Sequence, residues 1–394
     1  MVVLLVAVDL LDPLPIESAN SLGLVRRAPE KTFVGDKVLV ELVLSNEGKG
    51  VERLVIDDVP PSTAKVVRGS LSLDCGLKAR SSVTLRYEVV FREPGGYTFG
   101  TTRITLRSMF GLSEKTLVFY APFAVRVYPK LLSPKLSPIR AKAFGWSGTT
   151  PSTYRGGRLQ FMNIREYVSG DRISDVNWKA SARFGKRLVN EWQVERGLDC
   201  VVIVDLFSDD VPRVGDWSAR GDVIEAAYEI TDSFVAYGNR VGMLIMGRNL
   251  HKVKPGFGLR RLRAMVEGLI DSEEGEVWNL EYAEEFLERF FRRQYVKRGG
   301  TLFFVSAGTN MRLLNTVAAL SGRGFVCNSV VVDAIAGESE ALGESVKMKD
   351  EELALGRKVA RAELTWFEGR LSAHANVYEW SRYRGLSELR RRGK

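Results

Sequence analysis

The sequence predicts a two-domain protein in which an antiparallel β-sandwich is followed by a doubly wound α/β domain. Residues 22–130 alternate apolar and polar side chains, as half-buried strands do. From residue 198 onward, short apolar runs alternate with stretches of helical periodicity, the rhythm of β-α-β units. The length of 394 residues exceeds what one hydrophobic core usually serves. We expect a sandwich at 22–130, a basic linker at 131–197 and an α/β domain with C-terminal helices at 198–394.

Residues 1–21 precede the sandwich and open with an apolar run that Asp9 and Asp12 interrupt. The run is shorter than the roughly 20 residues that a membrane-crossing helix needs, and it lacks the basic start of a signal peptide. Two interpretations stay open, a buried first strand or helix and the remnant of a membrane anchor. We expect no complete transmembrane segment and a location in the cytoplasm or at the cytoplasmic face of the membrane.

Two stretches carry the clearest strand pattern of the first domain. Apolar residues recur at every second position from Val38 to Leu44 and from Val83 to Phe91. Turn-forming residues at 46–50, 59–62 and 93–96 separate such stretches, at the spacing expected of a sandwich. This half shows no catalytic constellation, and we interpret it as a packing or docking module.

The second domain begins with the apolar run Asp199–Asp205, which is typical of a central parallel strand. The alternation that follows predicts a parallel sheet with right-handed crossovers. The expected strands are 241–246, 301–306, 326–332 and 375–380, and the expected helices are 223–234, 259–269, 281–296 and 312–322. A charged helix is expected after Lys349, with an imperfect apolar stripe formed by Leu353, Val359, Leu364, Trp366 and Phe367.

Charged, glycine and tryptophan residues are dense between Arg165 and Arg183. The run contains Arg165, Tyr167, Gly170, Asp171, Asn177, Trp178, Ser181 and Arg183. Together with the stretches 57–61, 95–100, 110–112 and 254–258, this order resembles the domain of unknown function 58 family. The resemblance implies an Ig-like sandwich joined to a von Willebrand factor A-like domain. It also implies that these eight residues are the signature positions of the family. A MoxR-type AAA+ ATPase is the partner that the resemblance implies, in protein assembly or remodelling.

Positive charge is concentrated around the same run. Residues 130–190 hold twelve Lys/Arg and three Asp/Glu, a balance of +9 that equals the formal net charge of the whole chain. Such a strip could face anionic lipid, an acidic partner or nucleic acid. The interpretation we favour is that Arg165, Asp171, Trp178 and Arg183 form an ion-pair and stacking cluster that fastens the sandwich to the second domain.

The resemblance also implies a Mg²⁺ site of the form Asp-x-Ser-x-Ser at the end of the first α/β strand. This chain has Asp205-Leu-Phe-Ser-Asp209 instead, and Ala307 stands where a further Asp is usual. Asp205, Ser208 and Asp209 are therefore candidate ligands of a degenerate site, and we expect no cofactor. Oxygen ligands of this kind would suit Mg²⁺.

The sequence offers few residues or motifs for catalysis or metal binding. The chain has two histidines, no P-loop, and three separated cysteines, which we expect to be reduced thiols. We expect a non-enzymatic adaptor or scaffold with no small-molecule substrate. The alternatives are a nucleic-acid-binding protein that uses the 130–190 strip, and a metal-dependent von Willebrand A-like binding module.

Overall fold

The computed structural model describes residues 20–108, 113–130, 159–171, 173–194, 199–207, 211–214, 217–236, 238–273, 300–307, 311–345 and 349–382. Apart from residues 20 and 21, the predicted N-terminal segment lies outside these ranges, as does the helix expected at 281–296. Within the described ranges, no helix is both long enough and apolar enough to cross a bilayer. All three cysteines are free thiols, as expected.

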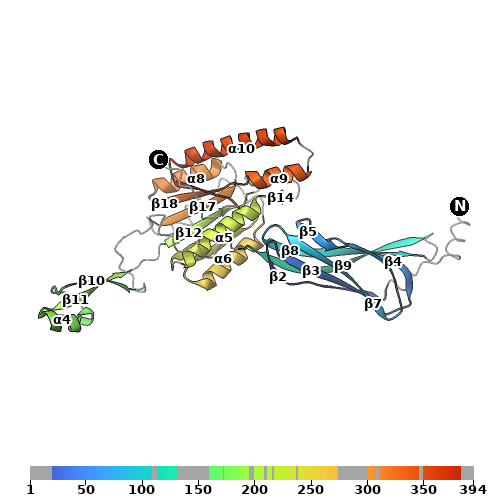
Figure 1. Cartoon of the computed structure of the whole chain (residues 1–394), viewed down its shortest axis with the longest axis horizontal. Coiled ribbons are helices and arrows are strands. Elements are labelled where there is room, and N and C mark those ends of the chain that lie inside the picture. Colours follow the sequence, from blue (N-terminus) through green and yellow to red (C-terminus); the bar gives the residue numbers. More distant parts are fainter. Residues whose placement is uncertain are drawn as a thin grey trace, which may run out of the picture.

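The N-terminal region is built from two β-sheets that pack face to face (Figure 1). One has the order β1-β3-β7-β5, and its strands are Leu22–Arg27, Lys37–Asn46, Ser81–Phe91 and Ala64–Gly69. The other has the order β2-β9-β8-β4-β6, and its strands are Lys31–Phe33, Glu114–Tyr128, Gly95–Arg107, Val51–Asp58 and Ser72–Leu77. Every pairing is antiparallel except the short β2–β9 contact. The predicted antiparallel β-rich region is confirmed.

Strand burial follows the alternation in the sequence. Val38, Val40, Leu42 and Leu44 of β3 are all buried and face the core between the sheets. In β7, Leu85 is the first buried residue of the predicted alternation, and Val83 before it is only partly buried.

A polar cluster crosses this apolar core. The Asp58 carboxylate accepts hydrogen bonds from Arg26 at 2.5 Å, from Thr102 at 2.8 Å and from the Tyr87 hydroxyl. Burial, followed by the bond to Asp58, raises the pKa of Tyr87. Arg26 and Tyr87 belong to one sheet while Asp58 and Thr102 belong to the other, so the cluster ties the two sheets together. Removing one partner of such a buried pair typically costs about 3–5 kcal/mol.

The C-terminal domain contains a six-stranded sheet in the order β16-β15-β12-β17-β18-β19. The strands are Leu250–Gly256, Arg240–Met246, Asp199–Asp205, Thr301–Ala307, Val326–Val332 and Asn376–Trp380. The five strands from β15 to β19 in that order are parallel to one another, whereas β16 is antiparallel to β15. The five predicted strands are thus parallel as expected, and the antiparallel strand β16, which was not predicted, makes the sheet mixed. Only residues 247–249 separate β15 from β16, and so short a connection allows a hairpin but no crossover.

Helices cover both faces of this sheet. Apolar residues of α5 (Arg220–Ala236) and α6 (Leu259–Asp271) pack on one face, and those of α8 (Met311–Gly322) and α10 (Asp350–Leu371) pack on the other. These four helices confirm the predicted ones. The helix α9 (Ile335–Ser345) was not predicted. In α10, Leu364 and Phe367 are buried as expected, but Val359 and Trp366 are exposed, so the predicted stripe is wrong at those two positions.

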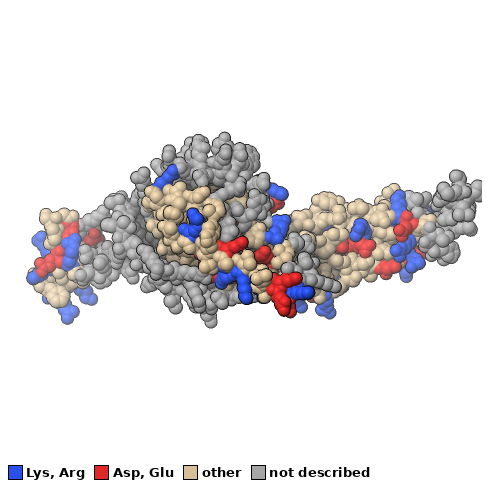
Figure 2. Space-filling view, turned by 90° about the horizontal axis from the view of Figure 1, so that it is seen from above, with Lys and Arg blue, Asp and Glu red and all other residues tan. Residues whose placement is uncertain are grey.

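The two domains meet through polar contacts. Arg126 of β9 pairs with Glu267 of α6 and lies 3.4 Å from Asp271, and the Tyr128 hydroxyl donates to Glu267 at 2.9 Å. The Arg220 guanidinium at the start of α5 donates to the Pro94 carbonyl at 2.9 Å. Figure 2 shows acidic and basic side chains side by side where the sandwich meets the α/β domain.

Candidate functional site

The described residues 159–171 and 173–194 form a small folded unit, which we call the signature unit. Strands β10 (Leu159–Glu166) and β11 (Leu188–Val194) pair as an antiparallel hairpin. The connection between them contains a 3-10 turn (Ile173–Asp175) and the short helix α4 (Trp178–Phe184). In Figure 1 the unit stands apart from the sandwich, with the α/β domain between them. The stretch that we expected to be a basic linker therefore contains a structured element.

An ion pair fixes the first turn of the signature unit. The Arg165 guanidinium donates two hydrogen bonds to the Asp171 carboxylate, at 2.7 and 2.8 Å. The same carboxylate accepts from the Val168 amide at 2.9 Å. Hydrogen bonding from Arg165, and then from the Val168 amide, lowers the pKa of Asp171. Gly170 has a φ of 111°, a conformation that side-chain-bearing residues rarely adopt, which explains a glycine inside this turn.

A second set of polar contacts anchors α4 to the hairpin. Asn177 caps the helix, since its side-chain oxygen accepts from the Ala180 amide at 2.9 Å while its amide group donates to Asn190 at 2.9 Å. The Ser181 hydroxyl donates to the Asn177 carbonyl at 2.8 Å and accepts from the Leu188 amide at 2.9 Å. The Tyr167 amide donates to the Arg187 carbonyl at 2.8 Å. Four of the predicted signature residues thus build the frame of the unit: Arg165, Asp171, Asn177 and Ser181.

Trp178 and Arg183 do not belong to this frame, because their side chains lie on the surface. The Trp178 side chain is 67% exposed, and Phe184 at the other end of α4 is exposed to the same extent. Val168 and Ile173 are exposed as well, whereas Val189 is the one buried apolar residue among the described side chains of the unit. A unit of this size has little volume for a core of its own. Its exposed apolar residues therefore form a surface that a partner could cover.

The predicted fastening cluster is only partly present. The Arg165–Asp171 ion pair exists, but Trp178 and Arg183 are exposed on α4 and the unit does not lie at the sandwich. The contacts that do join the two domains come from residues such as Arg126 and Glu267, which the sequence did not single out.

The candidate metal loop is described only in part. Asp205 is buried at the end of β12, and its carboxylate accepts from the Phe207 amide at 3.2 Å. Ser208 and Asp209 lie outside the described residues. In the neighbouring strand, Ser306 is buried and Ala307 supplies no ligand. The described part of the chain contains no group of three or more His, Cys, Asp or Glu side chains that could hold a metal. Of the three candidate ligands, the structure thus describes Asp205 alone.

Comparison with known proteins places the signature unit and most of the α/β domain in one family. Residues 163–363 match the family model described as protein of unknown function DUF58. The uncharacterised protein YeaD of Bacillus subtilis is 26% identical over 181 residues, which is 45% of this chain and 43% of YeaD. The chain thus spans less than half the length of this relative.

Two solved structures are similar over smaller parts. The CARDB domain of a Pyrococcus furiosus protein matches 28% of this chain and 94% of its own, at 17% identity and a TM-score of 0.20. The conserved hypothetical protein BatB of Bacteroides thetaiotaomicron matches 34% of this chain and 67% of its own, at 14% identity and a TM-score of 0.24. The family match covers the residues that build and present the signature unit, and this chain belongs to the DUF58 family.

Proposed function

We propose that this protein is a non-enzymatic adaptor or scaffold whose signature unit docks onto a partner protein. The observation that carries the proposal is the construction of that unit. Arg165, Asp171 and Asn177 hold a rigid frame, and the frame presents Trp178 and Phe184 to solvent. Exposed aromatic residues on a folded frame are typical of an interaction surface.

The partner that we propose is a MoxR-type AAA+ ATPase, which the resemblance of the sequence suggests. The chain would help that ATPase to assemble or remodel other proteins near a membrane, and it would contribute no catalytic residue itself. We further propose that the α/β domain is a von Willebrand A-like binding module. Its support is a buried Asp205 at the end of the central strand β12, in a sheet with helices on both faces.

The experiment is a pull-down of the full chain with the MoxR-type ATPase from the same source. The test variant is Trp178→Ala/Phe184→Ala, because neither side chain supports the frame. The matched control is Val118→Ala/Tyr120→Ala, which removes two apolar side chains that are 65% and 72% exposed on β9 of the sandwich. We expect the test variant to bind at least about tenfold more weakly and the control to bind like wild type.

Two outcomes would contradict this proposal. Equal retention of all three proteins would show that the signature unit is not the docking surface. No retention of wild type would remove the ATPase as the partner.

A second candidate function is binding to nucleic acid. It is favoured by one observation: Lys179, Arg183 and Arg187 form no ion pair with any carboxylate among the described residues, and they lie in the same unit as the exposed Trp178. Cations and an exposed aromatic ring on one small unit suit a single strand. A gel shift at low salt that weakens steeply as salt rises would support this function, and the absence of a shift at low salt would remove it. Anionic vesicles in the same assay would test the membrane alternative.

A further inference from the structure

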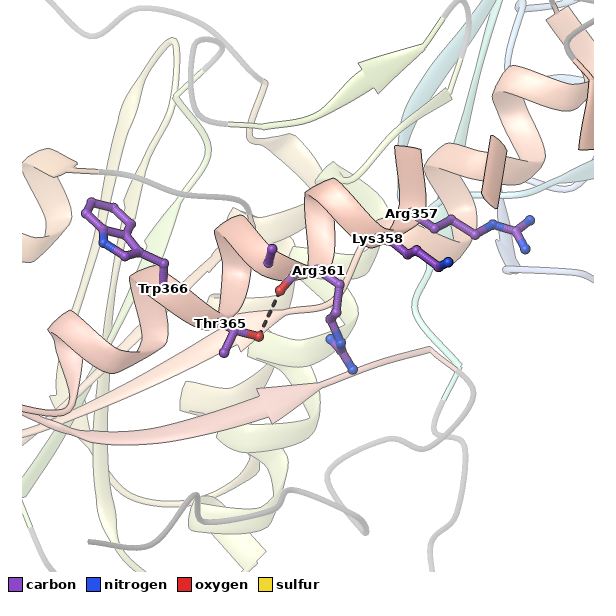
Figure 3. Close-up of a pocket in the computed structure, with 6 residues that line it drawn as sticks. Arg357, Lys358, Arg361, Thr365 and Trp366 are labelled. Carbon is purple, nitrogen blue, oxygen red and sulfur yellow. Dashed lines mark hydrogen bonds between the residues drawn. The ribbon is translucent and has the colours of Figure 1, made fainter. Parts of the chain in front are cut away.

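An open groove of about 710 Å³ runs along α10, far along the chain from the signature unit (Figure 3). Its described lining consists of Arg357, Lys358, Arg361, Ala362, Thr365 and Trp366. These residues fall into two rows at four-residue spacing, and such residues share one side of an α-helix. The lining covers about 13 Å of helix, the length of about four residues of extended chain.

One end of the groove is positively charged. The Arg361 guanidinium donates to Glu379 at 2.6 Å and to Asp333 at 3.1 Å, so these carboxylates take up its charge and hold it in place. Arg357 and Lys358 have no carboxylate partner among the described residues. In Figure 3 they lie together, toward the N-terminal half of the helix. Recognition of a negative charge therefore falls to Arg357 and Lys358.

The other end of the groove offers an aromatic surface. Trp366 is 53% exposed, and the Arg370 guanidinium lies over its ring, 5.3 Å from the centroid. This contact restricts the indole while leaving much of it open to solvent. The adjacent Thr365 hydroxyl donates to the Arg361 carbonyl at 2.8 Å. Tryptophan and arginine are the residues that most often dominate binding energy at protein interfaces.

We propose that this groove binds an acidic peptide segment of a partner protein. Carboxylates of the peptide would contact Arg357 and Lys358, and an apolar side chain about three residues away would pack on Ala362 and Trp366. The basic C-terminal tail of this chain does not fit, because residues 382–394 carry six Lys/Arg and one Glu. Among the described residues, a polyanion such as nucleic acid would find three cations without a carboxylate partner here, Arg357, Lys358 and Arg370, and the carboxylates Asp333 and Glu379 lie between them at Arg361.

The test measures fluorescence anisotropy of a short labelled peptide in which glutamates flank one phenylalanine. Two matched peptides replace either the glutamates with glutamine or the phenylalanine with alanine. We expect the full chain to bind the acidic peptide at least about tenfold more tightly than either matched peptide. Arg357→Glu/Lys358→Glu and Trp366→Ala should each weaken binding at least about tenfold. These side chains are exposed, so the variants are expected to fold, and circular dichroism checks this.

The control is Arg260→Glu/Arg263→Glu, which makes the same change of charge on two exposed positions of α6. It should bind the acidic peptide like wild type. Equal weakening by this control would overturn the proposal, because binding would then follow net charge and not the groove. Absence of binding up to about 1 mM would also overturn it, as would binding of anionic vesicles or DNA at α10 without binding of the peptide. The outcome is independent of the signature unit, since Trp178→Ala/Phe184→Ala leaves the groove intact.

Discussion

At the scale of single residues, Glu225 is a buried carboxyl group at the domain junction with other carboxyl groups around it. It is buried on α5, near Asp222 and near Glu93 of the sandwich. Arg382 lies 2.7 Å from the Asp222 carboxylate and 3.8 Å from that of Glu225, so the positive charge of one guanidinium is shared between these two carboxylates. Burial raises the pKa of Glu225 from its ordinary value of 4.5 to about 7, with Arg382 acting in the opposite direction.

This environment predicts how stability depends on pH. Between about pH 4.5 and pH 7, the folded state keeps the proton on Glu225 while the unfolded chain has released it. Because the folded state then binds more protons, the free energy of unfolding falls as the pH rises through this window. Glutamine does not titrate, so the free energy of unfolding of Glu225→Gln should not fall in this way. Relative to wild type, it should rise by roughly 2–3 kcal/mol as the pH goes from about 4.5 to about 7.

Urea titrations at several pH values measure the effect. The control is Glu340→Gln, which removes an exposed carboxyl of the same domain and should leave the pH profile like that of wild type. Parallel profiles for wild type and Glu225→Gln would contradict the prediction.

At the scale of secondary structure, α4 depends on its cap. The helix has seven residues and none of them is buried, so neither length nor packing stabilises it. The Asn177 side chain satisfies the Ala180 amide and also reaches Asn190 on β11. We expect Asn177→Ala to cost about 1 kcal/mol of local stability, which makes hydrogen exchange at Ala180 and Ser181 about fivefold faster. Ser174→Ala, at an exposed neighbouring position, is the control and should leave exchange unchanged.

The strands show which elements could be predicted from the sequence. Strands β3 and β12 are buried on one or both faces, and burial imposes an apolar pattern that can be recognised directly. Strand β16 carries Lys252, Lys254 and Pro255 at the edge of the sheet, and only its pairing with β15 makes it a strand. The signature unit was missed as a folded element because its described contacts are side-chain hydrogen bonds, which leave no periodic pattern in the sequence.

At the scale of the whole molecule, the sequence predicted the order of the domains but not how they meet. The ion pair expected between Arg165 and Asp171 is present, yet it stabilises the signature unit alone. The junction itself depends on contacts between residues more than a hundred positions apart, such as Arg126 with Glu267 and Arg220 with Pro94. Periodicity reports local structure, so it carries no information about such pairs.

The junction predicts a rigid connection to which Arg220 contributes two hydrogen bonds. The Arg220 guanidinium donates to two backbone carbonyls, Pro94 of the sandwich at 2.9 Å and Ser272 after α6 at 2.6 Å. Ser272 is fully buried, so removing the donor leaves a buried carbonyl without this bond, at a typical cost of about 1–3 kcal/mol. The pair of Arg126 and Glu267 cannot compensate fully, because partly exposed ion pairs contribute about 1 kcal/mol or less. We therefore expect Arg220→Ala to widen the range of domain orientations.

Small-angle X-ray scattering, combined with urea unfolding, measures both consequences. The radius of gyration should rise and the free energy of unfolding should fall, because the sandwich would no longer be held against α5 and α6. Arg103→Ala is the matched control, since it removes an exposed arginine from β8 of the same sandwich. Unchanged scattering for Arg220→Ala would mean that the other contacts of the junction fix the orientation, among them those of Arg126 and Tyr128 with Glu267. In that case the charge reversal Arg126→Glu, and not the loss of Arg220, would be the change that separates the domains.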